Sequence, residues 1–336
     1  LGHNYVDGKC DVCGDEIVLP SGAAELRLRG ATLKLEADLT LKIKVNDATF
    51  AEGAYSNFRL EVSMTDAGTG KVRTVVIDEN SKYDVSGAAK MYYFTGISPK
   101  QMGDVITLDL YGTFAGQEYC KSMTYTLSTY CYNQMAANNA KLRTLLADLL
   151  NFGAAHQKYT GYNTENLVNA AMTDAQKGYA SSGELTLENK LNVKYAVLEG
   201  ATASFRGATL SLTNKVEIQY VVQVADLTDV SLHLTTGSTT YVVDASKFVP
   251  RTGYANQYYV YFDGICANQY DETITFTFMK GGEEVGATLN YSVNTYLKVA
   301  SEHDSTRNNA NLIALLNAIN EYGQAAMAFK NVANNG

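Results

Sequence analysis

The chain has 336 residues, enough for two domains that each bury a sizeable core. Asp and Glu number 35 against 27 Lys and Arg, and this acidic balance argues against a nucleic-acid partner, which would need clustered basic residues. With 46% hydrophobic and 18% charged residues and no uninterrupted apolar run of about 18 residues, the sequence excludes a disordered chain and predicts no membrane insertion.

The N-terminal segment, residues 1–20, contains the one group of residues in the sequence that resembles a metal site. Cys10 and Cys13 flank a tight turn and His3 precedes them, which makes two thiolates and one imidazole available. A structural zinc site usually takes four ligands, so this Cys-knuckle is one ligand short. A structural zinc ion, a local Cys10–Cys13 disulfide and free thiols all remain open, and no other cofactor is indicated. The start of the chain, without Met or a leader, is typical of an excised or mature fragment.

Residues 21–165 are predicted to form a first lobe. Apolar and polar residues alternate in short runs separated by glycine turns, as in 39–45, and this is the pattern of half-buried antiparallel strands. From Leu142 to Tyr159 the apolar residues recur at spacings of three and four, which predicts a helix whose apolar face lies on the sheet. Residues 166–195 are polar and mixed, and they predict a partly helical connector.

Residues 196–336 repeat the plan of the first lobe. The matched segments, in chain order, are Arg29–Leu33 with Arg206–Leu210, Tyr93–Ile97 with Tyr261–Ile265, Tyr125–Tyr130 with Tyr291–Tyr296, and Leu142–Tyr159 with Leu312–Phe329. Because the matches keep their order, the sequence predicts an α+β fold of tandem duplicated antiparallel β-sandwich lobes, each closed by a C-terminal α-helix. Gly153 and Gly323 take matching positions in these helices, and we expect them where two backbones approach closely.

Sequence signatures of catalysis are absent, and the chain is predicted not to be an enzyme. It has no HExxH, no G-x-S-x-G and no Walker motif, and none of its four His residues occurs at an equivalent place in both copies. Cys120, Cys131 and Cys266 are expected to be incidental to function. Cys131 matches Leu297 and Cys266 matches Ser98, so these thiols are not part of a shared scaffold.

The aromatic residues are skewed toward tyrosine, with 24 Tyr, 11 Phe and no Trp. Alternation that places Phe94 and Phe262 inward sends Tyr93, Tyr259 and Tyr261 to the opposite face of their strands. Two interpretations remain open. The rings could pack beneath the closing helix, or they could form a platform on which sugar rings stack while amides bond the hydroxyls.

Four segments carry a resemblance to a known family. His3–Gly14 resembles a Cys-knuckle segment of large secreted proteins from anaerobic gut bacteria, and Tyr125–Tyr130, Leu142–Ala155 and Gly161–Asn169 resemble a sandwich-plus-helix module of the same proteins. Some members belong to cell-surface starch-adherence assemblies of the amylosome type, where a two-lobed version of the module binds α-1,4-glucan.

The resemblance covers nearly the whole chain, although it carries no specific site motif. It implies a secreted or cell-surface protein that binds starch and maltooligosaccharides in a groove between two pseudo-symmetric lobes, with neighbouring proteins of the surface complex as further partners. The alternative prediction, from a different functional class, is a spacer or protein-interaction module of a multidomain surface protein.

Ligand-specific positions are expected where the two copies diverge. Lobe 2 has extra residues in the tract 251–258, which is predicted to be a loop that presents two rings, and lobe 1 has extra residues within 46–57. A curved, neutral glucan needs rings set at an angle with amides or charged tips between them. The candidate binding residues are therefore Arg251, Tyr254, Asn256, Gln257 and Tyr258 in lobe 2, and Phe50, Tyr55, Asn57, Tyr83 and Lys90 in lobe 1.

Overall fold

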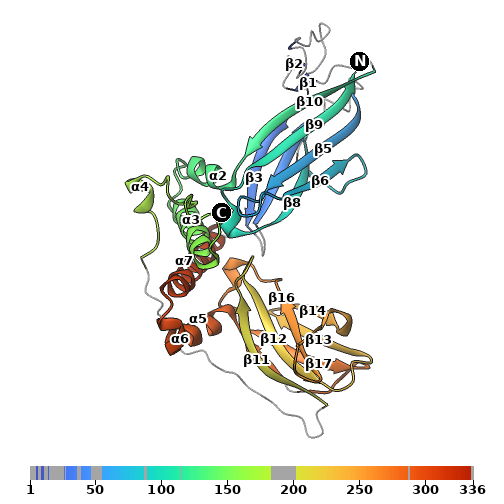
Figure 1. Cartoon of the computed structure of the whole chain (residues 1–336), viewed down its shortest axis with the longest axis vertical. Coiled ribbons are helices and arrows are strands. Elements are labelled where there is room, and N and C mark those ends of the chain that lie inside the picture. The colour runs from blue at the N-terminus through green and yellow to red at the C-terminus, as the bar shows by residue number, and fades with distance from the viewer. Residues whose placement is uncertain are drawn as a thin grey trace.

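The computed structural model describes residues 5–6, 9–10, 14, 26, 28–35, 39–46, 55–86, 89–114, 116–182, 202–286 and 288–333. Within these residues the chain forms two lobes of β-sheet beside a group of helices (Figure 1). The predicted α+β class with mainly antiparallel sheets is confirmed. None of the described helices combines the length and the apolar character that crossing a membrane requires.

Lobe 1 consists of two sheets packed face to face. One sheet has the strand order β3-β4-β8-β7 and the other β10-β9-β5-β6, with β1 and β2 added beyond β10. The core lies between the sheets, where Phe58 stacks on Tyr92 with 5.5 Å between ring centroids. The strands are β1 (Tyr5–Val6), β2 (Lys9–Cys10), β3 (Leu28–Leu35), β4 (Leu39–Asn46), β5 (Ser56–Thr65), β6 (Val72–Asp78), β7 (Asp84–Ser86), β8 (Ala89–Ile97), β9 (Ile106–Phe114) and β10 (Gln117–Tyr125).

Lobe 2 also has two sheets with a core between them. One sheet has the order β11-β12-β16-β15, and the other has β14-β13-β17, with β18 and β19 both paired to β17. Tyr220 and Phe276, from opposite sheets, have ring centroids 3.8 Å apart. The strands are β11 (Ala203–Ser211), β12 (Glu217–Val224), β13 (Val230–Thr236), β14 (Thr239–Asp244), β15 (Val249–Pro250), β16 (Gln257–Phe262), β17 (Ile274–Lys280), β18 (Glu283–Glu284) and β19 (Leu289–Tyr291).

Strands β3 and β11 each have a β-bulge at the repeated Arg-Gly-Ala sequence. The register shifts between Leu28 and Ala31 in β3 and between Phe205 and Gly207 in β11. In lobe 1 the bulge places Gly30 at φ +103°, a conformation open to glycine but strained for other residues. The two lobes therefore have the same strand order in the bulged sheet and the same irregularity in its first strand.

A tyrosine hydroxyl ties the bulged strand to the opposite sheet in both lobes. Tyr125 donates to the carbonyl of Ala31 at 2.8 Å, and Tyr291 donates to the carbonyl of Ala208 at 3.2 Å. These are matching residues of the sequence repeat. Because a buried hydroxyl needs a partner, the bond explains why tyrosine rather than phenylalanine stands at both places.

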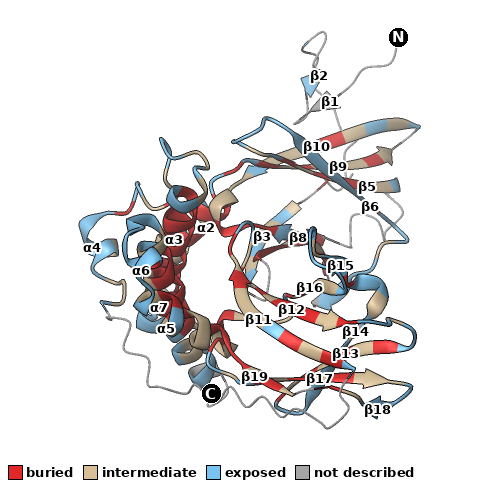
Figure 2. Ribbon diagram, turned by 60° about the horizontal axis from the view of Figure 1, so that its bottom comes forward, coloured by how far each residue is buried: buried red, intermediate tan, exposed pale blue. Residues whose placement is uncertain are grey.

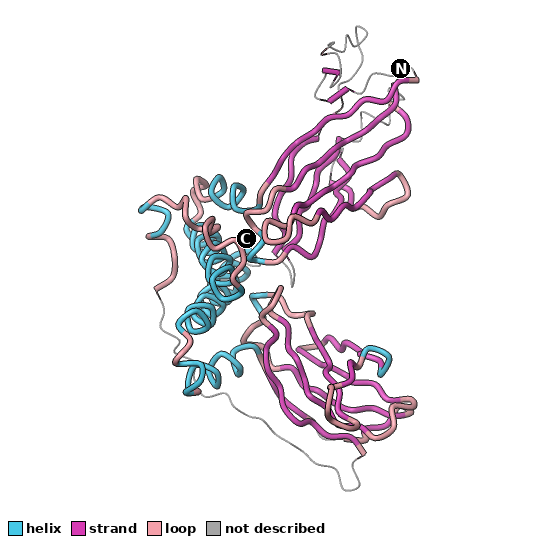
Figure 3. The backbone as a smooth tube through the Cα atoms, viewed as in Figure 1, coloured by secondary structure: helices cyan, strands magenta, loops and turns pink. Residues whose placement is uncertain are grey.

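The helices gather beside the two lobes (Figure 3). The long helices α3 and α7 pack on each other, α3 also packs on η1 and α7 on η3. The prediction that each closing helix lays its apolar face on its own sheet is therefore wrong for most of that face, because the sheets already bury their apolar faces between themselves. The helices are η1 (Pro99–Gln101), α2 (Leu127–Gln134), α3 (Ala140–Thr160), α4 (Asp174–Lys177), η2 (Ala245–Lys247), η3 (Ala267–Gln269), α5 (Val293–Glu302), α6 (Asp304–Arg307) and α7 (Ala310–Ala333).

Gly153 and Gly323 lie where α3 and α7 meet the short helices η1 and η3. A Cβ atom on Gly153 would stand 2.8 Å from the Pro99 carbonyl oxygen, and one on Gly323 would stand 3.4 Å from the Ala267 carbonyl oxygen. The first distance is a close backbone approach that only glycine permits without displacement, whereas the second is an ordinary contact, and the atom closest to a Cβ on Gly323 belongs to the Tyr270 ring, at 2.8 Å. The prediction of a close backbone approach is confirmed for Gly153 and wrong for Gly323, where a side chain is the close neighbour.

The N-terminal segment, predicted as a separate Cys-knuckle, contributes strands to lobe 1. β1 runs parallel to β10, with Tyr5 opposite Tyr119, and β2 pairs with β1. His3 and Cys13 lie outside the described residues, as does the side chain of Cys10. Among the residues that are described, no three His, Cys, Asp or Glu side chains are grouped to hold a metal ion.

Two of the four sheets lie between the other two. Figure 2 shows the sheet that contains β3 and β8 and the sheet that contains β11, β12 and β16 as the middle layers of the molecule. Their inner faces are turned into their own lobe cores, so their outer faces are turned toward the other lobe.

Lobe 1 holds lobe 2 at the turn between β11 and β12. The three donors come from η1, from the residue before it and from α3, and each bonds to a backbone carbonyl. The contacts are Ser98 Oγ to Asn214 O, Lys100 Nζ to Thr213 O at 2.7 Å, and His156 Nε2 to Leu212 O at 2.8 Å.

Candidate functional site

The outer face of β12 and β16 presents tyrosine and glutamine side chains. Val260 and Phe262 are buried, so the alternating residues Tyr259 and Tyr261 point away from the core. Their ring centroids lie 6.3 Å apart and their planes are inclined by 43°. Gln219, opposite Tyr261 on β12, donates to the Tyr261 hydroxyl at 2.8 Å.

A tight turn between β15 and β16 extends this face. The amide of Tyr254 donates to the Arg251 carbonyl, and the amide of Arg251 donates to the Gln257 carbonyl at 2.9 Å, which closes the turn. The Arg251 guanidinium lies 3.8 Å from the Tyr254 ring centroid and 5.9 Å from that of Tyr259. The Tyr254 side chain remains 52% exposed.

We call the residues Gln219, Arg251, Tyr254, Tyr259 and Tyr261 the lobe 2 tyrosine face. It combines three tyrosine rings, two of them inclined by 43°, with one guanidinium and one amide. Such a surface can stack against the apolar side of a ring and bond to neutral hydroxyl groups.

Three of the predicted lobe 2 residues have structural roles, although Asn256 is also exposed. Gln257 and Tyr258 belong to β16 and not to a loop, and Tyr258 is on the core-facing side, packed against Phe248 at 6.3 Å between centroids. Asn256 takes φ +58° in the turn, and its carbonyl accepts from the Val224 amide at 2.9 Å. The expectation that Tyr258 is a loop ring is therefore wrong.

Four of the predicted lobe 1 residues gather at the end of the sandwich far from the helices. A cavity of about 190 Å³ there is lined by residues that include Tyr55, Asn57 and Lys90. The Lys90 ammonium lies 4.8 Å from the ring centroid of Tyr83, which is 42% exposed. Phe50 lies outside the described residues.

Tyr55 is not an exposed ligand ring, contrary to its predicted role. It is 5% exposed and packs against Phe114 and Tyr119, at 5.6 and 6.2 Å between centroids. Asn57 takes φ +56° and donates to the Thr113 hydroxyl at 3.1 Å. Both residues shape the wall of the cavity.

The matching outer face of lobe 1 is basic rather than amide-rich. Tyr93, which matches Tyr261, lies opposite Lys42 on β4 and bonds through its hydroxyl to the carboxylate of Asp84. The Lys34 ammonium lies 5.2 Å from the Tyr93 ring centroid. This face offers charged groups where the lobe 2 face offers uncharged ones.

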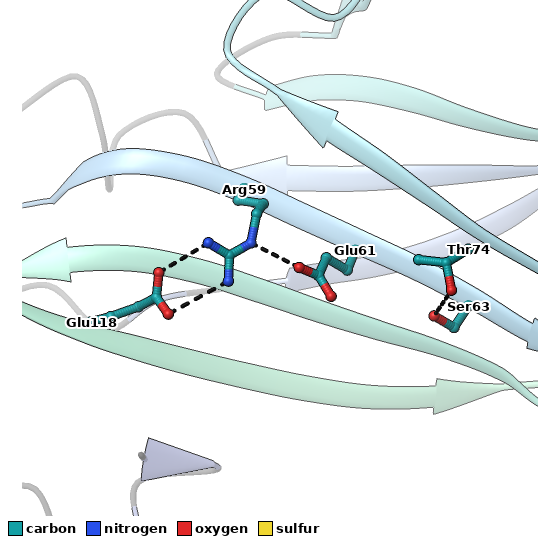
Figure 4. A network of polar contacts seen from close by, with 5 residues as sticks. All are labelled: Arg59, Glu61, Ser63, Thr74 and Glu118. Atoms are coloured by element: carbon teal, nitrogen blue, oxygen red, sulfur yellow. Dashed lines mark hydrogen bonds and ion pairs between the residues drawn. The ribbon is translucent and has the colours of Figure 1, made fainter. Parts of the chain in front are cut away.

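The outward face of the other lobe 1 sheet is closed by ion pairs. Arg59 makes two hydrogen bonds to Glu118 and one to Glu61, while Ser63 bonds to Thr74 (Figure 4). The guanidinium also lies 4.0 Å from the Tyr111 ring centroid. These contacts join β5, β9 and β10. The charge of Arg59 is therefore paired with carboxylates of its own sheet.

Asp104, His156 and Glu321 are among the groups whose pKa values are strongly shifted. Burial raises the pKa of Asp104 to about 6, and its carboxylate accepts from the Tyr162 hydroxyl at 2.6 Å. Burial lowers the pKa of His156 to about 4, and burial followed by the charge of Asp148 raises that of Glu321 to about 7. Asp104 and His156 therefore make hydrogen bonds that connect segments of the fold to one another.

Comparison with known proteins adds no relative. No protein-family model and no curated protein matches this chain.

Proposed function

We propose that the two lobes are copies of one unit and that the protein is a non-catalytic module that binds starch or another α-1,4-glucan. The matching strand orders, bulges and tyrosine bonds support the duplication. The resemblance to modules of secreted and cell-surface proteins supports the ligand and the location, because those modules include starch-adherence proteins.

The observation that carries the binding proposal is the lobe 2 tyrosine face. Tyr259 and Tyr261 lie on the same side of one strand with their rings inclined by 43°, and Arg251 brings Tyr254 beside them. A glucan helix presents successive sugar rings along a curve, so inclined platforms suit it better than coplanar ones. Gln219 and the Tyr hydroxyls supply uncharged partners for sugar hydroxyls.

The position of this face supports a groove between the lobes. The sheet that bears it is one of the two middle layers, with its outer face turned toward lobe 1. In this proposal, lobe 1 contributes the charged outer face around Tyr93. The cavity beside Tyr83 and Lys90 is large enough for a single sugar ring and serves as a secondary site.

Affinity electrophoresis in gels containing amylopectin tests the function, and calorimetry with maltooligosaccharides tests the site. Loss of a stacked ring costs on the order of 1 kcal/mol, so Tyr259→Ala together with Tyr261→Ala should lower affinity by at least about tenfold. Tyr241→Ala, which removes an exposed ring on β14 in the opposite sheet of the same lobe, is the matched control. Wild-type protein that is not retarded by amylopectin would remove the function, whereas retardation unchanged in the double variant would remove only this site.

A protein-interaction role is the second candidate, and the edge strand β6 favours it. β6 ends its sheet, and Val72 and Val76 on it are 60% and 55% exposed. An edge strand with exposed apolar side chains can pair with a strand of another protein. Val76→Lys should abolish such pairing without changing amylopectin retardation, and a pull-down with neighbouring proteins of the surface complex would measure it.

A further inference from the structure

The contact between α3 and α7 brings matching residues together. Phe152 of α3 and Tyr322 of α7, which take equivalent positions in the repeat, stack with 5.6 Å between centroids and 22° between planes. One helical turn further along α3, the His156 ring also stacks on Phe152, with 5.9 Å between centroids and 5° between planes. Three rings therefore form a continuous stack across the junction of the lobes.

His156 fills one end of the stack and is fixed there by the opposite lobe. Its Nε2 lies 2.8 Å from the Leu212 carbonyl oxygen, which can only accept, so Nε2 carries the proton. The side chain is 1% exposed, and burial, opposed by the bond to Leu212 and reinforced by the charge of Lys100, keeps its pKa at about 4. The imidazole is therefore neutral, flat and bonded through one N–H.

The other end of the stack opens on a cavity. Ala326 takes the position in α7 that His156 takes in α3, and it lines a cavity of about 470 Å³ together with Tyr322. Leu35, which matches Leu212 in the sequence repeat, lines the same cavity. Tyr322 and Leu35 thus border the cavity, and the residues that match them, Phe152 and Leu212, contact the His156 imidazole on the opposite side of the junction.

The remaining walls of the cavity are apolar with a basic rim. Leu33, Leu142, Leu145 and Leu146 contribute aliphatic side chains, and Phe329 contributes a second ring. The rim includes Lys34 and Lys330, both exposed. A volume of this size lies within the range of small-molecule sites, and apolar walls with a few polar groups are their usual lining.

We propose that this cavity binds a small planar heteroaromatic molecule with an N–H donor, which stacks on Tyr322 and bonds to the carbonyl of Leu35. The ligand takes the place in α7 that the His156 side chain takes in α3. The basic rim favours ligands with an acidic substituent over cationic ones. This site is distinct from the lobe 2 tyrosine face and does not depend on glucan binding.

Indole is a suitable probe, because the chain contains no tryptophan and indole can be excited at wavelengths where tyrosine absorbs little. Titration should show saturable binding of indole at one site. Benzofuran, which has the same shape but lacks the N–H, should bind about tenfold more weakly, because it leaves a carbonyl without its donor. Equal affinities for the two probes would overturn the assignment of the bond to Leu35.

Two variants test the location. Ala326→Phe fills the cavity without adding an indole group to the protein, and it should weaken indole binding by at least about tenfold. Ala326→His copies the residue found at position 156, and it should both exclude indole and leave the melting temperature at or above that of the wild type. Undiminished indole binding in a folded Ala326→His protein would overturn the proposal.

His156→Ala is the matched control. It should open the counterpart position, so that indole then binds at a second site and restores part of the lost stability. Indole should bind equally well to the Tyr259→Ala, Tyr261→Ala double variant, and this result separates the present proposal from the glucan proposal.

Discussion

On β16 of lobe 2, Tyr261 lies opposite Gln219, whereas at the matching place in lobe 1 Tyr93 lies opposite Lys42. The ring is kept in both lobes, but its partner changes from an amide to an ammonium group. In the interior the lobes agree instead, as the hydrogen bonds from Tyr125 to Ala31 and from Tyr291 to Ala208 show. The two interiors thus have matching contacts, while the two outer faces present different chemical groups.

The largest effect on stability is expected at the contacts of α3 with η1 and of α7 with η3, where the two helices differ. In Gly153→Ala the new Cβ would stand 2.8 Å from a backbone oxygen and 2.7 Å from Val168, whereas in Gly323→Ala the shortest contact, 2.8 Å, is to the Tyr270 ring. We expect the free energy of unfolding to fall by about 3 kcal/mol in the first variant and about 1 kcal/mol in the second, because backbone yields less than a side chain. Chemical denaturation measures both, and equal losses would contradict this difference.

The next effect separates the two faces of β16. Tyr258→Ala should lower the free energy of unfolding by about 2 kcal/mol, because the ring packs against the core beside Phe248. Tyr259→Ala, one residue further on the opposite face, should change stability little and weaken maltooligosaccharide binding about fivefold. Thermal unfolding and calorimetry on the two variants give the comparison, and a reversed pattern would show that the strand faces are exchanged.

A smaller effect sharpens the comparison of the outer faces. Gln219→Lys gives lobe 2 the partner that lobe 1 has, and it should weaken glucan binding about threefold, because the amide that bonds to Tyr261 is lost. Lys42→Gln makes the reverse change in lobe 1 and should not weaken binding. If Lys42→Gln proved the more harmful variant, lobe 1 would be the main binding lobe.

The smallest effect concerns the helix pair and depends on pH. Burial and the Asp148 charge raise the pKa of Glu321 to about 7 in the folded protein, while Asn151 stands at the matching place in α3. The folded state therefore holds a proton that the unfolded state loses, so stability falls as pH rises from about 4.5 to about 7 and stays lower above that window. Because Glu321 is partly exposed, we expect Glu321→Asn to raise the melting temperature by only about 2 °C at pH 8.

Near pH 5 the Glu321→Asn variant and the wild type should melt together, since the glutamic acid is then neutral in the fold. Calorimetric melting curves at both pH values measure the difference. A gain at pH 5 that equals the gain at pH 8 would show that packing rather than charge is responsible.

The sequence predicted the side of the strand for Tyr259 and Tyr261, because alternation is a local property. It did not predict that Tyr258 lies in β16, since the pairing of Tyr258 with Pro250 depends on a turn that Arg251 and Gln257 close. Tyr55 was misplaced for a similar reason. Its neighbours Phe114 and Tyr119 come from strands distant in the sequence, and no local pattern indicates that they cover it.

The helices show the same limit at a larger scale. The spacing of apolar residues predicted that α3 and α7 bury a face, but an apolar face does not identify its partner, and the two helices bury theirs on each other. The cavity beside Ala326 had a signal in the sequence, because His156 stands at the matching position of the repeat. Where one copy has a large side chain and the other a small one, the space around the small side chain is predicted to be less completely filled.

The junction at the β11–β12 turn has a consequence for how the sequence can change. Ser98, Lys100 and His156 all bond to backbone carbonyls of residues 212–214 and not to their side chains. Every residue type carries such a carbonyl, so substitutions in the turn that keep its backbone path leave these bonds intact. At this turn, therefore, the lobe 2 sequence can vary as long as its backbone path is kept, whereas the lobe 1 donors cannot change without losing the bonds.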